Sequence, residues 1–477
     1  MVKAGANSGS TTQAIAILGE TASALALARL CSAQGMAVSV LATTSGESAT
    51  ADVAAAVGAS DCIIDARPEG RDGRADALLS LEAAIPAGAI VAVVASHRPV
   101  GPWARKLGRP GNFAGLVLGQ RFDEESAPEI VRTRDTSDDT VARLDGLLRR
   151  IGKNPIVVRD CTGFFSARVA GAFLNEAMAL VGEGVPAAVV ESSALESGMR
   201  AGPLSMLDEM SLKIPDEILH QELRDLEHEK QAHGHEHGHG HEHGHGHGHG
   251  HGHHHESGHA HFPGHDHNHD HGQGHADTRD HGHGHDQAPA STDAHDHQRP
   301  HEHAHSVKSR RMPEPAVYVM EKMAHGFKRM GRASGAGFYD YDDDGTVTLW
   351  SGLKAFERRT AKVPAEDIRD RLLVIQALEA VRCRDEGVVA SLEDADTGLL
   401  AYGFPATSGG VVGYINSFGT GAFVRRAAEL ATRYGERFRP PAGLEDLASR
   451  GRPLAEQPDA VPASRAAHGG SRPGPEA

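Results

Sequence analysis

The chain has 477 residues, 33 of them histidines, and a formal net charge of −16. This length allows two or three domains. The acidic balance argues against a nucleic-acid-binding protein, because phosphate binding needs clustered Lys and Arg. The four cysteines, Cys31, Cys62, Cys161 and Cys383, form no C-x-x-C pair, so we expect structural thiols in a reducing compartment rather than a disulfide framework.

The first segment, residues 1–12, is rich in Gly, Ser and Ala with a single Lys. We expect it to be a disordered tail, because it lacks the basic and apolar regions of a signal peptide. The apolar stretch 14–30 that follows contains Glu20 and Arg29 and is too short to span a bilayer. We therefore expect a cytoplasmic protein without a membrane partner.

Short apolar runs alternate with helical segments such as 75–84 and 140–151 over the next part of the chain. Strands that are apolar on both faces and alternate with helices indicate a parallel sheet covered on both sides. The sequence therefore predicts a doubly wound, Rossmann-like α/β domain of the NAD-binding type over residues 13–158. Its six predicted strands are 14–18, 37–41, 61–65, 89–95, 113–118 and 155–158.

A long helix is predicted over residues 164–182, and no further strand series follows it. We expect a first all-α domain over residues 159–345, interrupted by an insert at 231–311. A second helical repeat is predicted over 346–450. The Pro-, Ala- and Gly-rich end, 451–477, is expected to be a disordered tail.

The insert concentrates the histidines of the chain. Of the 33 histidines, 28 lie between His233 and His305, and this stretch holds 11 Asp or Glu against two Arg, so it carries −9 of the net charge of −16. In its central part His alternates with Gly. Since Gly loses the most entropy on ordering and few apolar residues offset that loss, we expect the insert to stay disordered.

Neutral imidazole suits Ni and Zn as a ligand, and its unperturbed pKa of about 6.5 leaves most rings deprotonated at neutral pH. Without fixed geometry we expect weak, multiple and unselective sites, not a catalytic metal centre. The alternative is a drifted low-complexity repeat without biological use. The candidate metal ligands are His235, His237, His239, His241, His243, His245, His247, His249, His251, His253, His254, His255, His265, His267, His269 and His271.

The segment 152–184, GKNPIVVRDCTGFFSARVAGAFLNEAMALVGEG, resembles the junction between the nucleotide domain and the helical domain of the 3-hydroxyacyl-CoA dehydrogenases. The likeness continues at 199–208 and at 331–339. A further stretch, 386–421, is similar to the repeated helical domain of the multifunctional fatty-acid β-oxidation proteins. The chain thus looks like the dehydrogenase part of those proteins without the hydratase domain. The family's pair of long helices after the second strand is missing.

The resemblance implies hydride transfer from the 3-hydroxyl carbon to NAD, with a His as base, a Glu that orients it, and a Ser and an Asn that hold the substrate oxygen. Here the His position is Val117 and the Asn position is Ala167, whereas the Glu position is Glu129 and the Ser position is Ser96, followed by His97. Valine cannot accept a proton. We therefore expect Glu129 to be a surface or strand-end carboxylate. His97 is expected to be a loop histidine, with a role as substitute base as the alternative.

The family's coenzyme motif G-x-G-x-x-G allows the backbone to approach the pyrophosphate. Its three glycine positions are Gly19, Thr21 and Ala24 here, and Glu20 adds a negative charge. The acidic residue expected at the end of the second strand is Ala42. Glu69 matches a family Glu on the nicotinamide side. The resemblance implies NAD as coenzyme, and these replacements predict a degenerate site.

Three hypotheses follow. The chain is a family member with impaired or lost hydride transfer and a metal-binding insert, or an active NAD-dependent enzyme with a rearranged site, or a Ni/Zn buffering or delivery protein on a dehydrogenase-like scaffold. Candidate partners are acyl-CoA, divalent metal ions, a second copy of the chain or an active paralogue. The changes at Val117, Ala167, Thr21 and Ala42 favour the first hypothesis.

Overall fold

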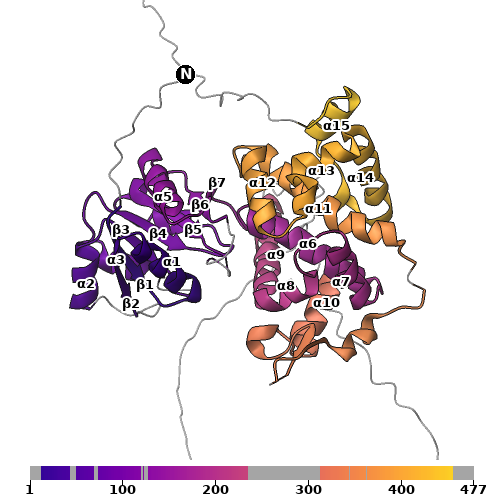
Figure 1. The fold of residues 1–477 in the computed structure, drawn as a ribbon, viewed down its shortest axis with the longest axis horizontal. Helices are drawn as coiled ribbons and strands as arrows, with labels where there is room; N and C mark the ends of the chain where they lie inside the picture. Colours follow the sequence, from indigo (N-terminus) through magenta and orange to yellow (C-terminus); the bar gives the residue numbers. More distant parts are fainter. Residues whose placement is uncertain are drawn as a thin grey trace, which may run out of the picture. The chain divides into compact units, whose positions relative to one another are not determined.

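The computed structural model describes residues 12–42, 50–68, 74–119, 122, 127–234, 312–342, 344–360 and 362–454. Within this part of the chain, a mostly parallel seven-stranded sheet with flanking helices is followed by a series of helices (Figure 1). The predicted fold class, a Rossmann-like domain followed by all-α domains, is confirmed. The expected disorder of the two tails and of the histidine-rich insert falls almost entirely outside the described residues.

The sheet has the strand order β2-β1-β3-β4-β5-β6-β7, and only β5 and β6 pair antiparallel. Because β2 and β3 lie on opposite sides of β1, the order reverses there, and ligands of open α/β sheets bind at the carboxyl ends of the strands beside such a reversal. The strands are β1 (Ala14–Leu18), β2 (Ala37–Leu41), β3 (Cys62–Asp65), β4 (Ile90–Val94), β5 (Phe113–Val117), β6 (Glu129–Arg132) and β7 (Ile156–Arg159).

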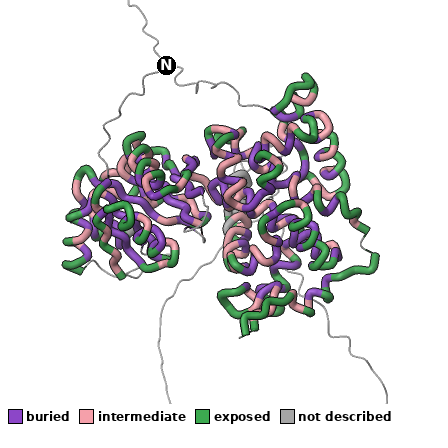
Figure 2. The backbone as a smooth tube through the Cα atoms, in the orientation of Figure 1, coloured by how far each residue is buried: buried purple, intermediate pink, exposed green. Residues whose placement is uncertain are grey.

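Helices cover both faces of the sheet. Side chains from α1 (Ala22–Ala33) and α5 (Asp138–Arg150) form one apolar cluster with the sheet. The opposite face packs on α2 (Ala51–Gly58), α3 (Arg74–Leu81) and the short α4 (Gly101–Ala104). Figure 2 shows most of the strands buried and the outer sides of these helices exposed, whereas the edge strand β2 is partly exposed. Helix α5 has Ser137 as N-cap, two Asp in its first turn and two Arg in its last, which matches the helix dipole.

Two elements of this domain differ from the prediction. The four-residue strand β6 was not predicted; it is short, and it pairs antiparallel with β5. The second is α2, an eight-residue helix between β2 and β3 whose N-cap Thr50 accepts a hydrogen bond from Val53 N at 3.3 Å.

The helical part begins with the predicted long helix, α6 (Ser166–Gly182), which packs against α10 and α11. A small hairpin, β8–β9, was not predicted. The remaining elements are α7 (Ala187–Glu196), α8 (Pro203–Met210), α9 (Lys213–Gly234), α10 (Glu314–Glu321), η2 (Lys322–Gly326), η3 (Arg332–Ser334), β8 (Tyr339–Tyr341), β9 (Val347–Leu349), η4 (Ser351–Phe356), α11 (Ala365–Asp385), α12 (Leu392–Ala401), η5 (Ala406–Ser408), α13 (Gly410–Phe418), α14 (Thr420–Tyr434), η6 (Glu436–Phe438) and α15 (Ala442–Ser449).

Asp208 joins the two motifs that the insert separates in sequence. Its buried carboxylate accepts hydrogen bonds from the backbone N–H groups of Phe338 at 2.8 Å and Tyr339 at 2.9 Å, and from the hydroxyl of Tyr341 at 2.9 Å. A Cβ on Gly337 would lie 2.0 Å from this carboxylate, so only glycine fits. The motif at 331–339 therefore packs on the end of α8 although more than 120 residues lie between them.

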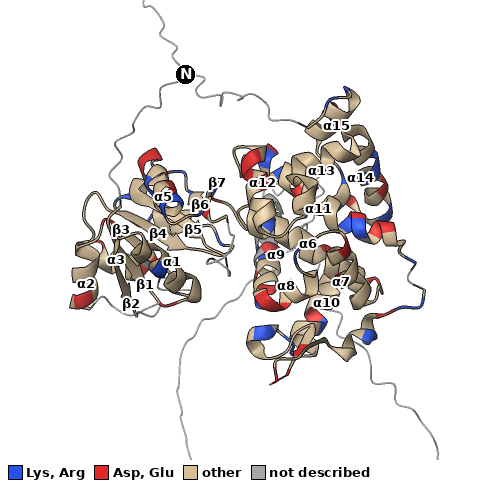
Figure 3. Ribbon diagram, in the orientation of Figure 1, with Lys and Arg blue, Asp and Glu red and all other residues tan. Residues whose placement is uncertain are grey.

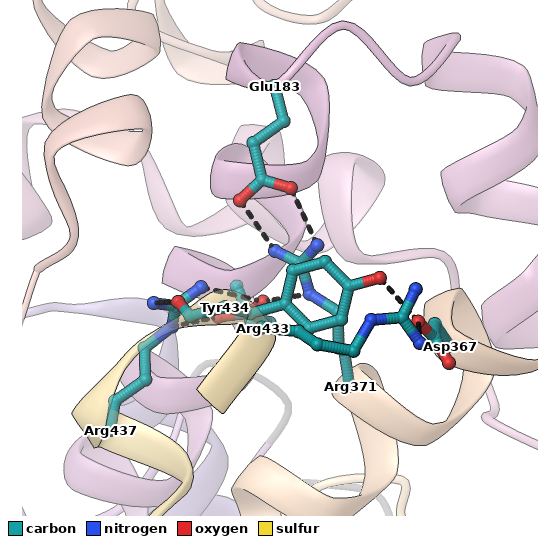
Figure 4. Close-up of polar contacts among 7 residues, drawn as sticks. Glu183, Asp367, Arg371, Arg433, Tyr434 and Arg437 are labelled. Atoms are coloured by element: carbon teal, nitrogen blue, oxygen red, sulfur yellow. Dashed lines mark hydrogen bonds and ion pairs between the residues drawn. The ribbon is translucent and has the colours of Figure 1, made fainter. Parts of the chain in front are cut away.

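A network of ion pairs joins α6 to α11 and η6 (Figure 4). Arg371 on α11 is fully buried; it donates to Glu176 at 2.5 Å and to both oxygens of Glu183, and Tyr434 stacks on its guanidinium. Glu176 also pairs with Arg437 at 2.5 Å. Elsewhere, charges gather on helices such as α14 and leave most of the strand residues uncharged (Figure 3). The buried pairs fix how α6, α11 and η6 meet, because bidentate guanidinium–carboxylate bonds have specific geometry.

The connection between α11 and α12 pairs with the edge strand β7 of the sheet. Arg159 N on the edge strand β7 donates to Val388 O at 2.8 Å, and Val158 forms an isolated antiparallel bridge with Val389. Paired backbone groups protect an edge strand that would otherwise be open to other chains.

The cysteines behave as expected for thiols in the core. Cys31, Cys62 and Cys383 are buried, Cys161 is half-buried, and no disulfide forms among the described residues. Burial raises the pKa of Cys31 to about 12 and also raises the pKa of Cys62 and Cys383, which makes these thiols unreactive.

Candidate active site

Val117 and Glu129 face each other across the antiparallel pair of β5 and β6. Val117 is the last residue of β5 and Glu129 the first of β6. Both side chains are buried. Directly opposed residues on neighbouring strands bring their side chains together. The two positions that the family motif spaces twelve residues apart therefore meet at the carboxyl end of β5.

Glu129 does not lie on the surface, so that expectation was wrong; the strand-end position was right. Its carboxylate accepts hydrogen bonds from Ser166 N at 2.7 Å and from Phe165 N at 3.3 Å, at the start of α6. Burial raises the pKa of Glu129 to about 7, although these bonds and the Ser166 side chain oppose the shift. Glu129 therefore binds the N-terminus of α6 to the sheet, a role that does not need a histidine.

Two residues at this point were not singled out in the sequence. Ser166 bonds to Glu129, and Tyr402, which follows α12, interacts with both: burial and the charge of Glu129 raise the pKa of Tyr402, and a hydrogen bond with Ser166 opposes this. A Cβ on Gly119 would lie 3.9 Å from the Tyr402 hydroxyl. Ser166 stands beside Ala167 in the matched motif, but nothing in the sequence pointed to Tyr402.

Ser96 and His97 follow β4 at the same end of the sheet. The Ser96 hydroxyl and His97 Nδ1 are 2.9 Å apart, Ser96 is exposed and His97 is buried. Gly163 N donates to the carbonyl oxygen of His97 at 2.7 Å and holds this loop. His97 thus lies in a loop as expected, and its imidazole is occupied by its neighbour.

The turn after β1 keeps one feature of a nucleotide site. Gly19 has a φ of +99°, and a Cβ there would lie 2.9 Å from Arg67 N, so the close approach of the β1 and β3 turns requires glycine. Ala24 is buried in α1. Ala42 is exposed just beyond β2, and Glu69 lies outside the described residues.

The start of α1 is already capped. Thr21 is its N-cap, and the Thr21 hydroxyl accepts a hydrogen bond from Ala24 N at 3.3 Å. The neighbouring arginines are also engaged, since Arg67 and Arg74 both donate to the buried carboxylate of Asp65 at 3.0–3.1 Å. A dinucleotide pyrophosphate needs free helix N–H groups and space for its oxygens. The described residues around Gly19 therefore do not fit the pyrophosphate of NAD.

The predicted metal ligands, His235 to His271, lie outside the described residues. Within the described residues, no group of three or more His, Cys, Asp or Glu side chains is placed to hold a metal ion. In that same part of the chain, no helix is long and apolar enough to cross a membrane.

Comparison with known proteins agrees with the architecture. A family model described as "3-hydroxyacyl-CoA dehydrogenase, NAD binding domain" matches residues 11–161, and one described as "3-hydroxyacyl-CoA dehydrogenase, C-terminal domain" matches residues 163–242. The fatty acid oxidation complex subunit alpha proteins of Vibrio parahaemolyticus and Vibrio cholerae are each 25% identical, over 82% of this chain and 44% of their own length. The chain thus spans less than half of these relatives.

Two solved structures share the fold over most of the chain. The 3-hydroxybutyryl-CoA dehydrogenase of Escherichia coli K12 aligns with a TM-score of 0.59 at 14% identity, covering 92% of this chain and 99% of that one. The dehydrogenase part of multifunctional enzyme 1 from Caenorhabditis elegans aligns with a TM-score of 0.52 at 14% identity, covering 91% and 89%. At this identity the likeness concerns the fold.

Proposed function

Because the chain belongs, through residues 11–242, to the 3-hydroxyacyl-CoA dehydrogenase family, we propose that it is a member of the fatty-acid oxidation type whose hydride transfer is impaired or lost. The observation that carries the proposal is the pairing of Val117 with Glu129. The family's base would stand at Val117, and an isopropyl group can neither accept a proton nor form a hydrogen bond. Loss of a general base typically costs about 10²–10⁴ in rate.

The neighbouring residues support the same proposal. Glu129, which would orient the base, is bound instead to Phe165 N and Ser166 N. Ala167 offers only a methyl group where the family Asn would hold the substrate oxygen. NAD, when bound, accepts the hydride in this family, yet the capped start of α1 opposes its binding. Residual activity would therefore rest on Ser96 alone among the family's substrate-contacting positions.

The intact helical part points to a retained binding role. Asp208 holds the family's two turn motifs together, and Arg371 links α6 to α11. We infer that the helices keep the capacity to bind an acyl-CoA or to pair with a second copy or an active paralogue. The histidine-rich insert adds divalent-metal binding to this scaffold, with Ni or Zn as the ions that imidazole favours.

The test is NADH-dependent reduction of acetoacetyl-CoA by the full chain. We expect wild type to turn over no faster than the Glu129→Gln variant, because Glu129 has no base to orient. An active family enzyme serves as the positive control in the same assay. Turnover by wild type that exceeds the variant tenfold or more, a difference of about 1.4 kcal/mol in barrier, would support the alternative of an active enzyme with a rearranged site.

A further inference from the structure

The first turn of α1 differs from the other capped helices in its place on the sheet. Helix α1 follows β1, beside the point where the strand order reverses, so its N-terminus faces the crevice in which nucleotides bind in such sheets. Gly19 brings this turn to within van der Waals contact of the β3 turn. The side chains between Gly19 and Ala24 therefore determine whether a nucleotide phosphate can approach the start of α1.

The Thr21 side chain lies at this position. Its backbone is extended, with φ −66° and ψ 155°, its hydroxyl accepts from Ala24 N at 3.3 Å, and the same hydroxyl lies 3.4 Å from that of Ser23. A phosphate oxygen at this helix N-terminus would compete with the hydroxyl for the N–H groups of the first turn. The hydroxyl thus occupies one N–H donor of the first turn, and the branched side chain stands where the family motif has glycine.

The charges around the crevice do not compensate. Glu20 is exposed beside Thr21, and a carboxylate there repels a phosphate. The guanidinium groups of Arg67 and Arg74, at the end of β3 and the start of α3, are directed to Asp65. A phosphate would therefore have to displace an internal cap and meet a negative charge.

We propose that Thr21 closes the coenzyme crevice by capping α1 with its own hydroxyl in the place of a pyrophosphate oxygen. The inference rests on the proposed function, in that it takes the crevice to be the family's coenzyme site. It goes further by assigning the loss of dinucleotide binding to one side chain. Removing that side chain reopens the crevice to the diphosphate of a nucleotide.

The experiment is titration of the full-length chain with NADH, followed by NADH fluorescence. The variants are Thr21→Gly, which removes the side chain, and Thr21→Ser, which keeps the hydroxyl. Ser137→Gly is the matched control, because the Ser137 hydroxyl caps α5 by accepting a hydrogen bond from Thr140 N at 3.2 Å. Since β6 runs antiparallel to β5, Ser137 follows it at the end of the sheet opposite to Thr21. Glycine is itself an acceptable N-cap that costs only a few tenths of a kcal/mol, so both Gly variants should melt close to wild type.

We expect no saturation up to ~1 mM for wild type, Thr21→Ser and Ser137→Gly, and binding at least about tenfold tighter for Thr21→Gly. ADP should compete with NADH in Thr21→Gly, whereas adenosine, which lacks the diphosphate, should not. Saturation of wild type below ~0.1 mM, equal binding by Thr21→Gly and Thr21→Ser, or equal competition by adenosine would each overturn the inference.

The outcome is separable from the proposed function. Thr21→Gly still carries Val117, so we expect it to bind NADH without a gain in acetoacetyl-CoA turnover. If Thr21→Gly both binds and turns over, the inference about Thr21 stands and the proposal of impaired hydride transfer falls. If it does not bind while wild type remains inactive, the inference falls and the proposal stands.

Discussion

Replacement of Glu129 by Gln tests the role of the carboxylate that the family's site has left behind. Glu129 is 1% exposed, and burial raises its pKa from 4.5 to about 7. A carboxyl whose pKa is raised in the folded state adds stability that is fully present below its unfolded pKa and is lost as the pH rises through the folded pKa. Wild type should therefore lose stability from this group between about pH 4.5 and pH 7 or slightly above.

The magnitude follows from the shift. At 1.36 kcal/mol for each pKa unit, the loss amounts to about 3 kcal/mol. Glutamine carries no charge at any of these pH values, so the difference in unfolding free energy between Glu129→Gln and wild type should grow by about 3 kcal/mol in favour of the variant from pH 4.5 to pH 8.5. One backbone bond at α6 is weakened in the variant, which costs about 1 kcal/mol at every pH.

The assay is urea unfolding at several pH values, compared through the unfolding midpoints, since a chain of this size need not unfold in one step. Asp139→Asn, which removes a carboxylate that is 67% exposed on α5, controls for the change in net charge. A difference between Glu129→Gln and wild type that stays constant from pH 4.5 to pH 8.5 would refute the assignment of a raised pKa to the buried Glu129 carboxyl.

Two other predictions concern the helices and the insert. Arg371→Met leaves the buried Glu176 with Arg437 as its remaining guanidinium partner and leaves Glu183 without its bidentate bond, so we expect a loss of about 3 kcal/mol in thermal or urea unfolding; an unchanged melting temperature would contradict this. Calorimetric titration with Ni or Zn at neutral pH should show several sites that disappear below about pH 5.5 as the histidine rings protonate, whereas a chain lacking residues 233–305 should show none of them, and a flat titration of the full chain would refute the prediction.

The fold and the family could be predicted from the sequence because both depend on local patterns. Apolar runs that alternate with helices predicted the parallel sheet, and the motif at 152–184 placed α6 correctly after β7. The twelve-residue spacing between Val117 and Glu129 also had a direct structural meaning, since an antiparallel return of that length sets the two residues opposite each other. The composition of residues 233–305 determined the metal-binding prediction without reference to any fold.

Tertiary structure alone decided what the site residues do. Glu129 was expected to be a surface or strand-end carboxylate because its partner histidine is absent; it lies at the strand end, but α6 supplies the Phe165 and Ser166 N–H groups that bind its carboxylate in the interior. Tyr402 reaches the same point from α12, more than 200 residues away in sequence. Thr21 was identified as the replacement of a motif glycine, while the hydrogen bond that its hydroxyl accepts from Ala24 N shows that it also caps the helix. Local patterns specify which residues turn inward; only the packed chain determines which distant donor or acceptor each buried polar group meets, because that choice depends on contacts between segments that lie far apart in sequence.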